Sequence, residues 1–354
     1  MTDREEQSID RQKEFSGTSP VRKGFELDID SLQKYMQKHV EGFSGTVALR
    51  QFKGGQSNPT YHITAGGKQY VLRRKPSGKL LKSAHAVDRE YKVITALGQT
   101  NVPVARTYAL CTDASIIGSW FYIMAYVDGR IFWTYADIPR EERPAIFKAM
   151  NTTMANLHQV DYKAVGLEDY GKAGDYFSRQ ISRWSKQYLA SVEERSAAMD
   201  DLMEWLLSNI PENDETTIVH GDYRVDNMIF HPTEPKILAV LDWELSTLGH
   251  PLSDFAYHCI IWRIPAGDWK GLAGIDLNAR NYPTEEAYMK TYCRRTEITS
   301  IENWNYYMAF NFFRLAGISF GIKGRLRDGT AASKHARASA DAAEPLAQFG
   351  LNQI

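Results

Sequence analysis

The sequence predicts an α+β protein with two lobes, a small antiparallel β lobe followed by a larger helical lobe. In residues 25–127 short segments rich in β-branched and aromatic residues alternate with Gly, Asn, Pro and Ser. Between residues 140 and 208 apolar residues mostly recur every three or four positions, which is the period of a helix. We therefore expect a flexible or disordered tail over residues 1–24, a first lobe over 25–127 and a second lobe over 128–354.

The first lobe contains five predicted strands and two predicted helices. One helix begins near Asp28, where Leu32 and Met36 are spaced to share one helical face. The other covers Ala84–Leu97 and ends before Gly98, a residue that commonly follows a helix. The strands are TVALRQF, TYHITAG, KQYVLRR, ARTYALC and SWFYIMAYV.

The second lobe is predicted to be helical apart from one short β patch, which comprises TIVHGDYRVDNMIF and KILAVLDWE. Residues 303–324 are apolar on nearly all faces, a pattern typical of a buried helix.

Composition narrows the class of protein. The chain has 354 residues, of which 43% are hydrophobic and 24% charged, as in ordinary globular proteins. The 42 Lys and Arg nearly balance the 43 Asp and Glu, so we expect no nucleic-acid partner. We find no apolar run long enough for a membrane span and no signal-peptide pattern. Three scattered cysteines suggest a reducing compartment, so we expect a cytoplasmic protein. The oligomeric state is left open.

The most informative stretch is His220-Gly-Asp222-Tyr-Arg-Val-Asp-Asn227, followed after a short hairpin by Leu241-Asp242-Trp-Glu244. Transfer of a phosphoryl group to a hydroxyl needs a carboxylate that orients the hydroxyl and takes its proton. It also needs oxygen ligands for the Mg²⁺ that bridges the ATP phosphates. Asp222 is predicted for the first role, and Asn227 and Asp242 for the second. The spacing matches the catalytic loop of kinases, although Asp and Asn are also ordinary turn residues.

Four neighbouring residues receive supporting roles. His220 would brace the loop by hydrogen bonding, and Asp254 would anchor it in the same way. Arg224 is a candidate catalytic residue that stabilises the transferred phosphoryl charge, with a structural ion pair as the alternative. Glu244 could reach the metal through water, although a salt bridge is the simpler interpretation.

A glycine-containing loop between two predicted strands is a candidate for holding the ATP phosphates. Two adjacent glycines allow the backbone to approach phosphate oxygens closely, although a simple hairpin turn would also use them. The loop residues are Gly54, Gly55, Gln56, Ser57 and Asn58.

The strand that ends in Tyr70-Val71-Leu72-Arg73 resembles the kinase strand V-A-I-K. Val71 and Arg73 share one face, so Val71 could cover adenine while Arg73 binds phosphate and pairs with Glu90. Arg stands where Lys is expected, and Arg74 or Lys75 could be the phosphate ligand instead. Two residues of the last strand and hinge are also predicted at adenine, namely Met124 and Tyr126.

These motifs together resemble the aminoglycoside phosphotransferase and choline kinase superfamily, the small-molecule branch of the protein-kinase-like fold. The resemblance rests on GGQSNPTY, YVLRRKP, HGDYRVDN and LDWELSTLGHPLSDFAY. It implies ATP, Mg²⁺ and phosphorylation of a hydroxyl on a small molecule. More narrowly, the sequence is similar to the kinase-like domain fused to certain acyl-CoA dehydrogenases, which implies a 4-hydroxyacyl-CoA substrate. No DFG or APE motif of a protein kinase is present.

The acceptor is less well defined than the reaction. A CoA thioester would suit two basic clusters, one in RRKPSGKLLKS and one at Lys323, Arg325 and Arg327, although either could be a solvated loop. An aminoglycoside is the alternative acceptor, and a nucleotide-binding pseudokinase is the alternative class of protein. The single departure that favours a pseudokinase is the Arg at position 73.

Overall fold

The computed structural model describes residues 16–54, 58–76, 86–330 and 336–354. These residues pack as two compact units. The first unit holds the chain up to Asp137 together with Val225–Glu244, and the second holds Ile138–Arg224 together with Leu245–Ile354. Whereas the predicted lobes divide the chain once, a segment of the later chain here returns to the first unit.

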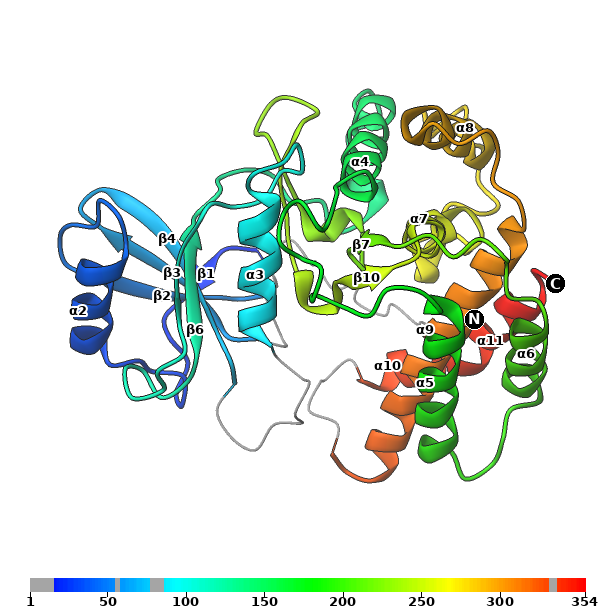
Figure 1. The fold of residues 1–354 in the computed structure, drawn as a ribbon, viewed down its shortest axis with the longest axis horizontal. Helices are drawn as coiled ribbons and strands as arrows, with labels where there is room; N and C mark the ends of the chain where they lie inside the picture. The colour runs from blue at the N-terminus through cyan, green and yellow to red at the C-terminus, as the bar shows by residue number, and fades with distance from the viewer. Residues whose placement is uncertain (1–15, 55–57, 77–85, 331–335) are drawn as a thin grey trace, which may run out of the picture. The chain divides into compact units, whose positions relative to one another are not determined.

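The first unit is built on one antiparallel sheet with the strand order β1-β2-β3-β4-β6-β5 (Figure 1). The strands are β1 (Thr18–Ser19), β2 (Ala48–Phe52), β3 (Thr60–Ala65), β4 (Lys68–Arg74), β5 (Thr107–Cys111) and β6 (Phe121–Ala125). All five predicted strands are present. The two-residue turn of the β3–β4 hairpin is Gly66-Gly67, and both glycines have the positive φ that tight hairpin turns require.

Strand β1 lies inside the segment expected to be a tail. Thr18 and Ser19 pair with Phe52 and Gln51 of β2, and the side chain of Arg50 donates from Nε to the Thr18 hydroxyl at 2.8 Å. Thr18 and Ser19 therefore belong to the sheet, which the polar composition did not indicate, because a two-residue edge strand is held by backbone pairing and needs no apolar pattern.

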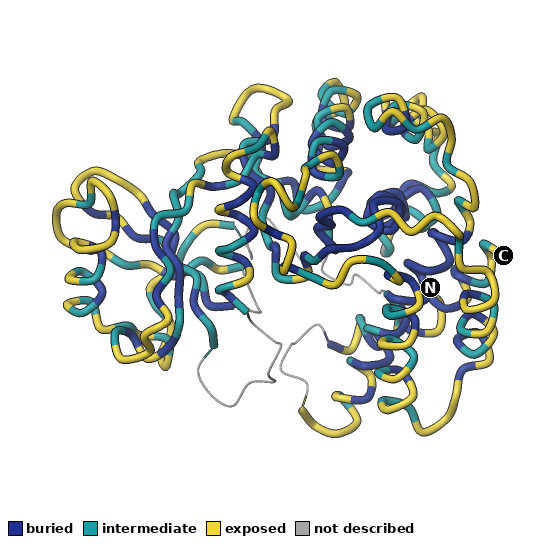
Figure 2. The backbone as a smooth tube through the Cα atoms, viewed as in Figure 1, coloured by how far each residue is buried: buried dark blue, intermediate teal, exposed yellow. Residues whose placement is uncertain are grey.

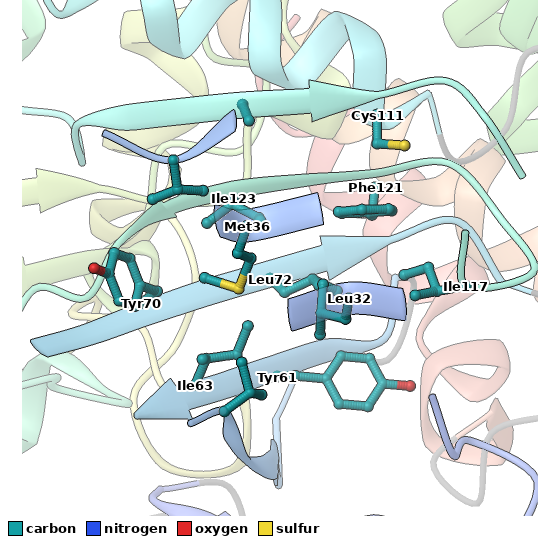
Figure 3. Close-up of a cluster of buried hydrophobic side chains, with 13 residues drawn as sticks. Leu32, Met36, Tyr61, Ile63, Tyr70, Leu72, Cys111, Ile117, Phe121 and Ile123 are labelled. Atoms are coloured by element: carbon teal, nitrogen blue, oxygen red, sulfur yellow. The ribbon is translucent and has the colours of Figure 1, made fainter. Parts of the chain in front are cut away.

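Helix α2 (Ile29–His39) covers one face of this sheet. Leu32 and Met36 point from α2 into a buried cluster that includes Tyr61, Leu72 and Phe121 (Figure 3). The carboxylate of Asp28 accepts from the backbone N–H of Ser31 and caps the helix, whose start was predicted near Asp28. Since neighbouring residues of a strand face opposite sides, the side chains next to these core residues face the other side of the sheet.

Helix α3 (Val87–Leu97) packs against β5 and β6. It ends before Gly98 as predicted, while residues 84 and 85 of the predicted helix lie outside the described residues. The returning segment adds a hairpin of β8 (Met228–Phe230) and β9 (Ile237–Val240). Backbone bonds tie it to the first unit, from Val240 N to Pro103 O at 2.8 Å and from Arg130 N to Phe230 O at 2.7 Å.

The second unit is helical, as predicted. Its helices are α4 (Arg143–His158), α5 (Tyr176–Ser191), α6 (Ala197–Ser208), α7 (Pro251–Cys259), α8 (Glu285–Thr296), α9 (Trp304–Arg327), α10 (Ala336–Asp341) and α11 (Ala343–Leu351). A two-stranded ladder pairs β7 (Thr217–Val219) with β10 (Thr247–Gly249). Helix α9 packs against α5, α7, α10 and α11, which explains its apolar residues on nearly all faces.

Figure 2 shows that buried residues in the second unit concentrate on α7, and most residues of α9 from Tyr306 to Gly324 are buried as well. Every residue of α7 is buried, so its polar side chains must find partners inside the protein. Among the helices of the described residues, none has both the length and the apolar character needed to cross a membrane.

Candidate active site

The face of the sheet opposite α2 borders a cavity of about 950 Å³ within the first unit. In β4, Tyr70 and Leu72 enter the core with α2, so Val71 and Arg73 face the cavity. On the neighbouring strand β6, Met124 lies directly opposite Val71 in the register. The cavity is lined by seven of the residues predicted to bind nucleotide or metal, namely Gly54, Val71, Arg73, Met124, Tyr126, Asn227 and Asp242.

The returning segment brings the two predicted metal ligands to this cavity. The backbone N–H of Leu241 donates to the carbonyl of Asn227 at 2.8 Å, which holds the ends of the β8–β9 hairpin together. This bond brings Asn227 close to Leu241 and so to the next residue, Asp242, and both Asn227 and Asp242 line the cavity. Asp242 has a φ of 64°, a left-handed conformation that is uncommon outside glycine and typical of functional sites.

Arg73 lies at the centre of an ionic network. Its Nε is 2.8 Å from Oε2 of Glu90, which is the predicted pairing. Its Nη2 donates to Oδ1 of Asp242 at 2.7 Å and lies 3.4 Å from Oε2 of Glu244. Burial alone would lower the pKa of Arg73, but Glu90 and Asp242 outweigh it and raise that pKa. Arg73 therefore stays charged.

Glu90 is almost completely buried and has two further partners. Nδ2 of Asn58 donates to its Oε1 at 2.8 Å, and the Tyr122 hydroxyl donates to its Oε2 at 3.1 Å. Burial raises the pKa of Glu90, and Arg73 opposes this shift. Glu90 and Asn58 do not line the cavity; they orient Arg73, which does.

The structure also distinguishes Arg73 from its two basic neighbours. Arg74 is buried on the α2 side, with its guanidinium 5.7 Å from the ring centre of Tyr61. Lys75 lies 3.2 Å from Asp88 and 4.0 Å from the ring centre of Trp120. Arg73 is the one of these three that reaches both Glu90 and the cavity. Gly55, Gln56 and Ser57 of the predicted phosphate loop lie outside the described residues.

The predicted catalytic loop lies in the second unit, where Asp254 of α7 holds its backbone. The Asp254 carboxylate accepts from the N–H groups of His220 and Gly221 at 2.7 and 2.9 Å and lies 3.3 Å from Nε2 of His158. Burial would raise the pKa of Asp254, but the hydrogen bond from His158 and the charges around it hold the pKa below its ordinary value. The expected anchoring role of Asp254 therefore has a direct geometric basis.

Asp222 is oriented by groups on both sides. Its N–H donates to Nδ1 of His220 at 3.2 Å, the bracing contact expected of that histidine. The Tyr257 hydroxyl donates a short hydrogen bond to Oδ1 of Asp222, and Nε of Arg224 lies 3.6 Å from the same oxygen. Burial raises the pKa of Asp222, but Arg224 and the Tyr257 bond outweigh this and leave the pKa lowered. The carboxylate is therefore ionised at neutral pH, as a proton acceptor must be.

Two residues near Asp222 were not predicted from the sequence. Tyr257 follows Asp254 by three positions on α7, so the two share a helical face, and this spacing could have identified it. Arg314 is the single cation between Trp304 and Ile322 of the apolar helix α9, which was an available signal because buried Arg is rare. It donates to the carbonyl of Gly221, and its guanidinium lies 4.8 Å from the ring centre of Tyr257.

Comparison with known proteins identifies the family. Residues 48–288, which contain all the predicted site residues, match the model of the phosphotransferase enzyme family. The chain belongs to this family. The predicted resemblance to aminoglycoside phosphotransferases is thereby confirmed.

Curated relatives of this phosphotransferase domain include acyl-CoA dehydrogenase family member 10 of Mus musculus, 44% identical over 94% of this chain and 32% of that protein. Family member 11 of Gallus gallus is 42% identical over 95% of this chain and 44% of that protein. The chain thus spans less than half the length of these relatives. The narrower predicted resemblance, to a kinase-like domain fused to acyl-CoA dehydrogenases, is confirmed as well.

Solved structures confirm the kinase-like fold. A crystal structure from Ralstonia eutropha, provisionally named an aminoglycoside phosphotransferase, is 50% identical, covers 93% of this chain and 98% of its own, and has a TM-score of 0.87. The aminoglycoside phosphotransferase APH(4)-Ia, in complex with ADP and hygromycin B, is 16% identical with a TM-score of 0.61 over 91% of this chain and 98% of its own. At that identity the likeness shows the fold alone.

Proposed function

We propose that this phosphotransferase moves the γ-phosphoryl group of ATP to a hydroxyl of a small molecule, with Mg²⁺ as cofactor. The observation that carries the proposal is the convergence of Arg73, Asn227 and Asp242 on one cavity of the first unit. A guanidinium, a carboxamide and a carboxylate are the groups that a metal–triphosphate complex requires. Membership of the phosphotransferase family supports the same reaction class.

The nucleotide would bind with its base against the apolar part of the cavity. Val71, Ile94, Ala105 and Met124 line that part from β4, α3 and β6 and from the chain before β5. Tyr126 follows them where β6 ends, in the position expected for a hinge. Arg73 would then bind the phosphates, with Gly54 at the start of the predicted phosphate loop.

The residues present fit Mg²⁺. The carboxamide of Asn227 and the carboxylate of Asp242 both belong to residues that line the cavity, and they would be the protein ligands. Mg²⁺ commonly takes one or two protein oxygens and completes its shell with phosphate and water. When bound, it supplies positive charge that offsets the phosphates. Asp242 is ion-paired to Arg73 in the free protein. When nucleotide and metal bind, Asp242 would pair with the metal and Arg73 with the phosphates, so each would keep a partner of opposite charge.

Asp222 would orient the acceptor hydroxyl and take its proton, because its carboxylate is ionised and fixed by Tyr257. Arg224 would stabilise negative charge on the phosphoryl group as it transfers. His220 and Asp254 would act through the position of the loop, not through contact with substrate.

For the acceptor we propose a 4-hydroxyacyl-CoA. The support comes from the relatives, in which a similar segment belongs to a chain named for acyl-CoA dehydrogenation, so one CoA thioester could serve both parts. The two basic clusters give less support to a CoA acceptor than the sequence suggested. Arg73, Arg74 and Lys75 all have partners within the first unit, and Arg327 lies 3.5 Å from Glu193 and 2.9 Å from Asp328. Lys79 and Lys82 lie outside the described residues.

An aminoglycoside remains the second candidate acceptor because the Ralstonia eutropha relative carries that name at 50% identity. Hygromycin-B 4-O-kinase of Escherichia coli is a more distant relative, 23% identical over 254 residues. A cytoplasmic location remains our prediction, and the three buried free cysteines are compatible with a reducing compartment.

The test is ADP release from MgATP with three acceptors, namely a 4-hydroxyacyl-CoA, the matching free hydroxy acid and an aminoglycoside. The Asp222→Asn variant is the blank, and we expect it to lose about 10²–10⁴-fold in rate. Release with the thioester alone would support the proposed acceptor. Release with the aminoglycoside would refute the proposed acceptor but would still support the proposed phosphotransfer reaction. No release with any acceptor, despite MgATP binding, would favour the pseudokinase.

A further inference from the structure

A second cavity, of about 450 Å³, lies within the second unit. Helices α4 and α8, which pack side by side (Figure 1), form its walls together with the loop around residues 278–283. It shares no lining residue with the cavity that contains Arg73 and Asp242, and neither Asp222 nor Arg224 lines it. The proposed phosphotransfer reaction therefore gives it no role.

The charged residues that line this second cavity are all positive. Lys148 of α4 and Arg294 and Arg295 of α8 line it, whereas no Asp or Glu is found among its described lining residues. On α8, Glu286 is ion-paired to Lys290 at 2.6 Å, and neither residue lines the cavity. Three cations without a carboxylate at one cavity create a local positive potential that favours an anion.

Arg295 is held in place by a buried amide. Its Nη1 donates to Oδ1 of Asn151 at 2.6 Å, and Asn151 is completely buried. Nδ2 of Asn151 donates in turn to the carbonyl of Tyr288 at 3.0 Å, so the amide cannot rotate away without losing both bonds. Burial lowers the pKa of Arg295, and the nearby Arg294 adds to this effect. A fixed guanidinium with a neutral partner is the kind of group that an anionic ligand stabilises.

Aromatic side chains form the remaining wall. Phe147 stacks edge to face with Tyr282, with ring centres 5.8 Å apart, and with Tyr288 at 5.9 Å. All three rings are buried and line the cavity. The site therefore offers an apolar surface beside its positive charges, which is the composition of a pocket for an organic anion.

We propose that this cavity between α4 and α8 binds a small organic phosphate. Its phosphate group would lie among Lys148, Arg294 and Arg295, and its ring or apolar body would contact Phe147 and Tyr282. This inference stands independently of the proposed reaction, because it uses neither the nucleotide cavity nor Asp222.

The test uses phenyl phosphate as probe, with inorganic phosphate and phenol as its two separate parts. Binding to the full chain is measured by calorimetry both with and without saturating Mg²⁺ and a non-hydrolysable ATP analogue, the proposed ligand of the first cavity. We expect phenyl phosphate to bind more tightly than either part, and its affinity to fall as salt is added.

Two exposed cations provide the variants. Arg294→Ala and Lys148→Ala should each weaken phenyl phosphate binding about tenfold, or about 1.4 kcal/mol. Lys290→Ala removes the same charge from the same helix outside the cavity and should leave the affinity unchanged. Arg295 is not the first choice, since its loss would leave the buried Asn151 oxygen unpaired. Absence of phenyl phosphate binding, or equal affinity in Arg294→Ala and Lys290→Ala, would overturn the proposal.

Discussion

Nη2 of Arg73 donates a 2.7 Å hydrogen bond to Oδ1 of Asp242, although 168 residues of chain lie between them. The pair joins the residue proposed for phosphate to the residue proposed for the metal. Glu90 holds the other side of the same guanidinium. This arrangement keeps three charged groups satisfied in the free protein and positions two of them at the cavity where the nucleotide would bind.

Removal of Asp242 tests the metal assignment. In Asp242→Asn the carboxylate that would bind Mg²⁺ is lost while the side-chain volume is kept, so ATP affinity should no longer rise when Mg²⁺ is added. Calorimetric titration of ATP with and without Mg²⁺ measures this difference. The same Mg²⁺ dependence in variant and wild type would refute the role of Asp242.

Loss of the Arg73 charge should destabilise the protein, because Glu90 is then left buried without its cation. We expect Arg73→Met to lower the free energy of unfolding by about 3–5 kcal/mol at pH 8. The folded-state pKa of Glu90 is already raised and should rise further, so protonation favours the folded variant and the deficit should shrink in acid. Urea unfolding of variant and wild type at pH 5 and pH 8 checks this sign.

A double variant serves as the control for this prediction. Arg73→Met combined with Glu90→Gln removes the buried charge, so it should recover much of the lost stability and lose the pH dependence of the deficit. If the single variant were as stable as the wild type at pH 8, the ion pair would have no structural role.

Tyr257→Phe should change the pH profile of the reaction. The Tyr257 hydrogen bond is one of the interactions that keep the pKa of Asp222 below its ordinary value. Its loss should raise that pKa and move the acid limb of kcat/KM to higher pH, while kcat/KM at pH 7 changes by less than about tenfold. Tyr306→Phe is the matched control because the buried Tyr306 hydroxyl has no hydrogen-bond partner among the described residues. An unmoved acid limb in Tyr257→Phe would contradict the positioning role.

Replacing either of two glycines of α9 by Ala should change the free energy of unfolding, and in opposite directions. A Cβ at Gly317 would meet no atom closer than 3.8 Å, so Gly317→Ala should stabilise the protein by up to about 1 kcal/mol through helix propensity. A Cβ at Gly324 would lie 2.8 Å from the backbone oxygen of Ser191, so Gly324→Ala should destabilise it. Urea unfolding of both variants tests the close approach of α9 to α5, and equal effects would contradict it.

Sequence reasoning succeeded where chemistry depends on local spacing. Asn227 and Asp242 line one cavity, as their short loop and hairpin suggested, and alternation along β4 sufficed to place Val71 and Arg73 on one face. The roles of Asp222, Asn227 and Asp242 in the reaction remain predictions. The Arg73–Glu90 pair followed from the order of strand and helix.

The sequence held signals that could have singled out Tyr257 and Arg314, but it did not show which distant residues they contact. Tyr257 reaches Asp222 across 35 positions, and Arg314 reaches Gly221 across 93. Neither contact leaves a periodic pattern, because each is a single polar side chain on a buried helix. Strand β1 was missed for a similar reason, since backbone pairing of two residues has no composition of its own.

The most direct test of the proposed reaction is to follow the acceptor itself. Purified protein is incubated with MgATP and a 4-hydroxyacyl-CoA, and the mass of the acceptor is measured by mass spectrometry. We predict that the acceptor gains one phosphoryl group with wild-type protein and none with Asp222→Asn. Formation of ADP with an unchanged acceptor, or equal phosphorylation by wild type and Asp222→Asn, would contradict the proposed function.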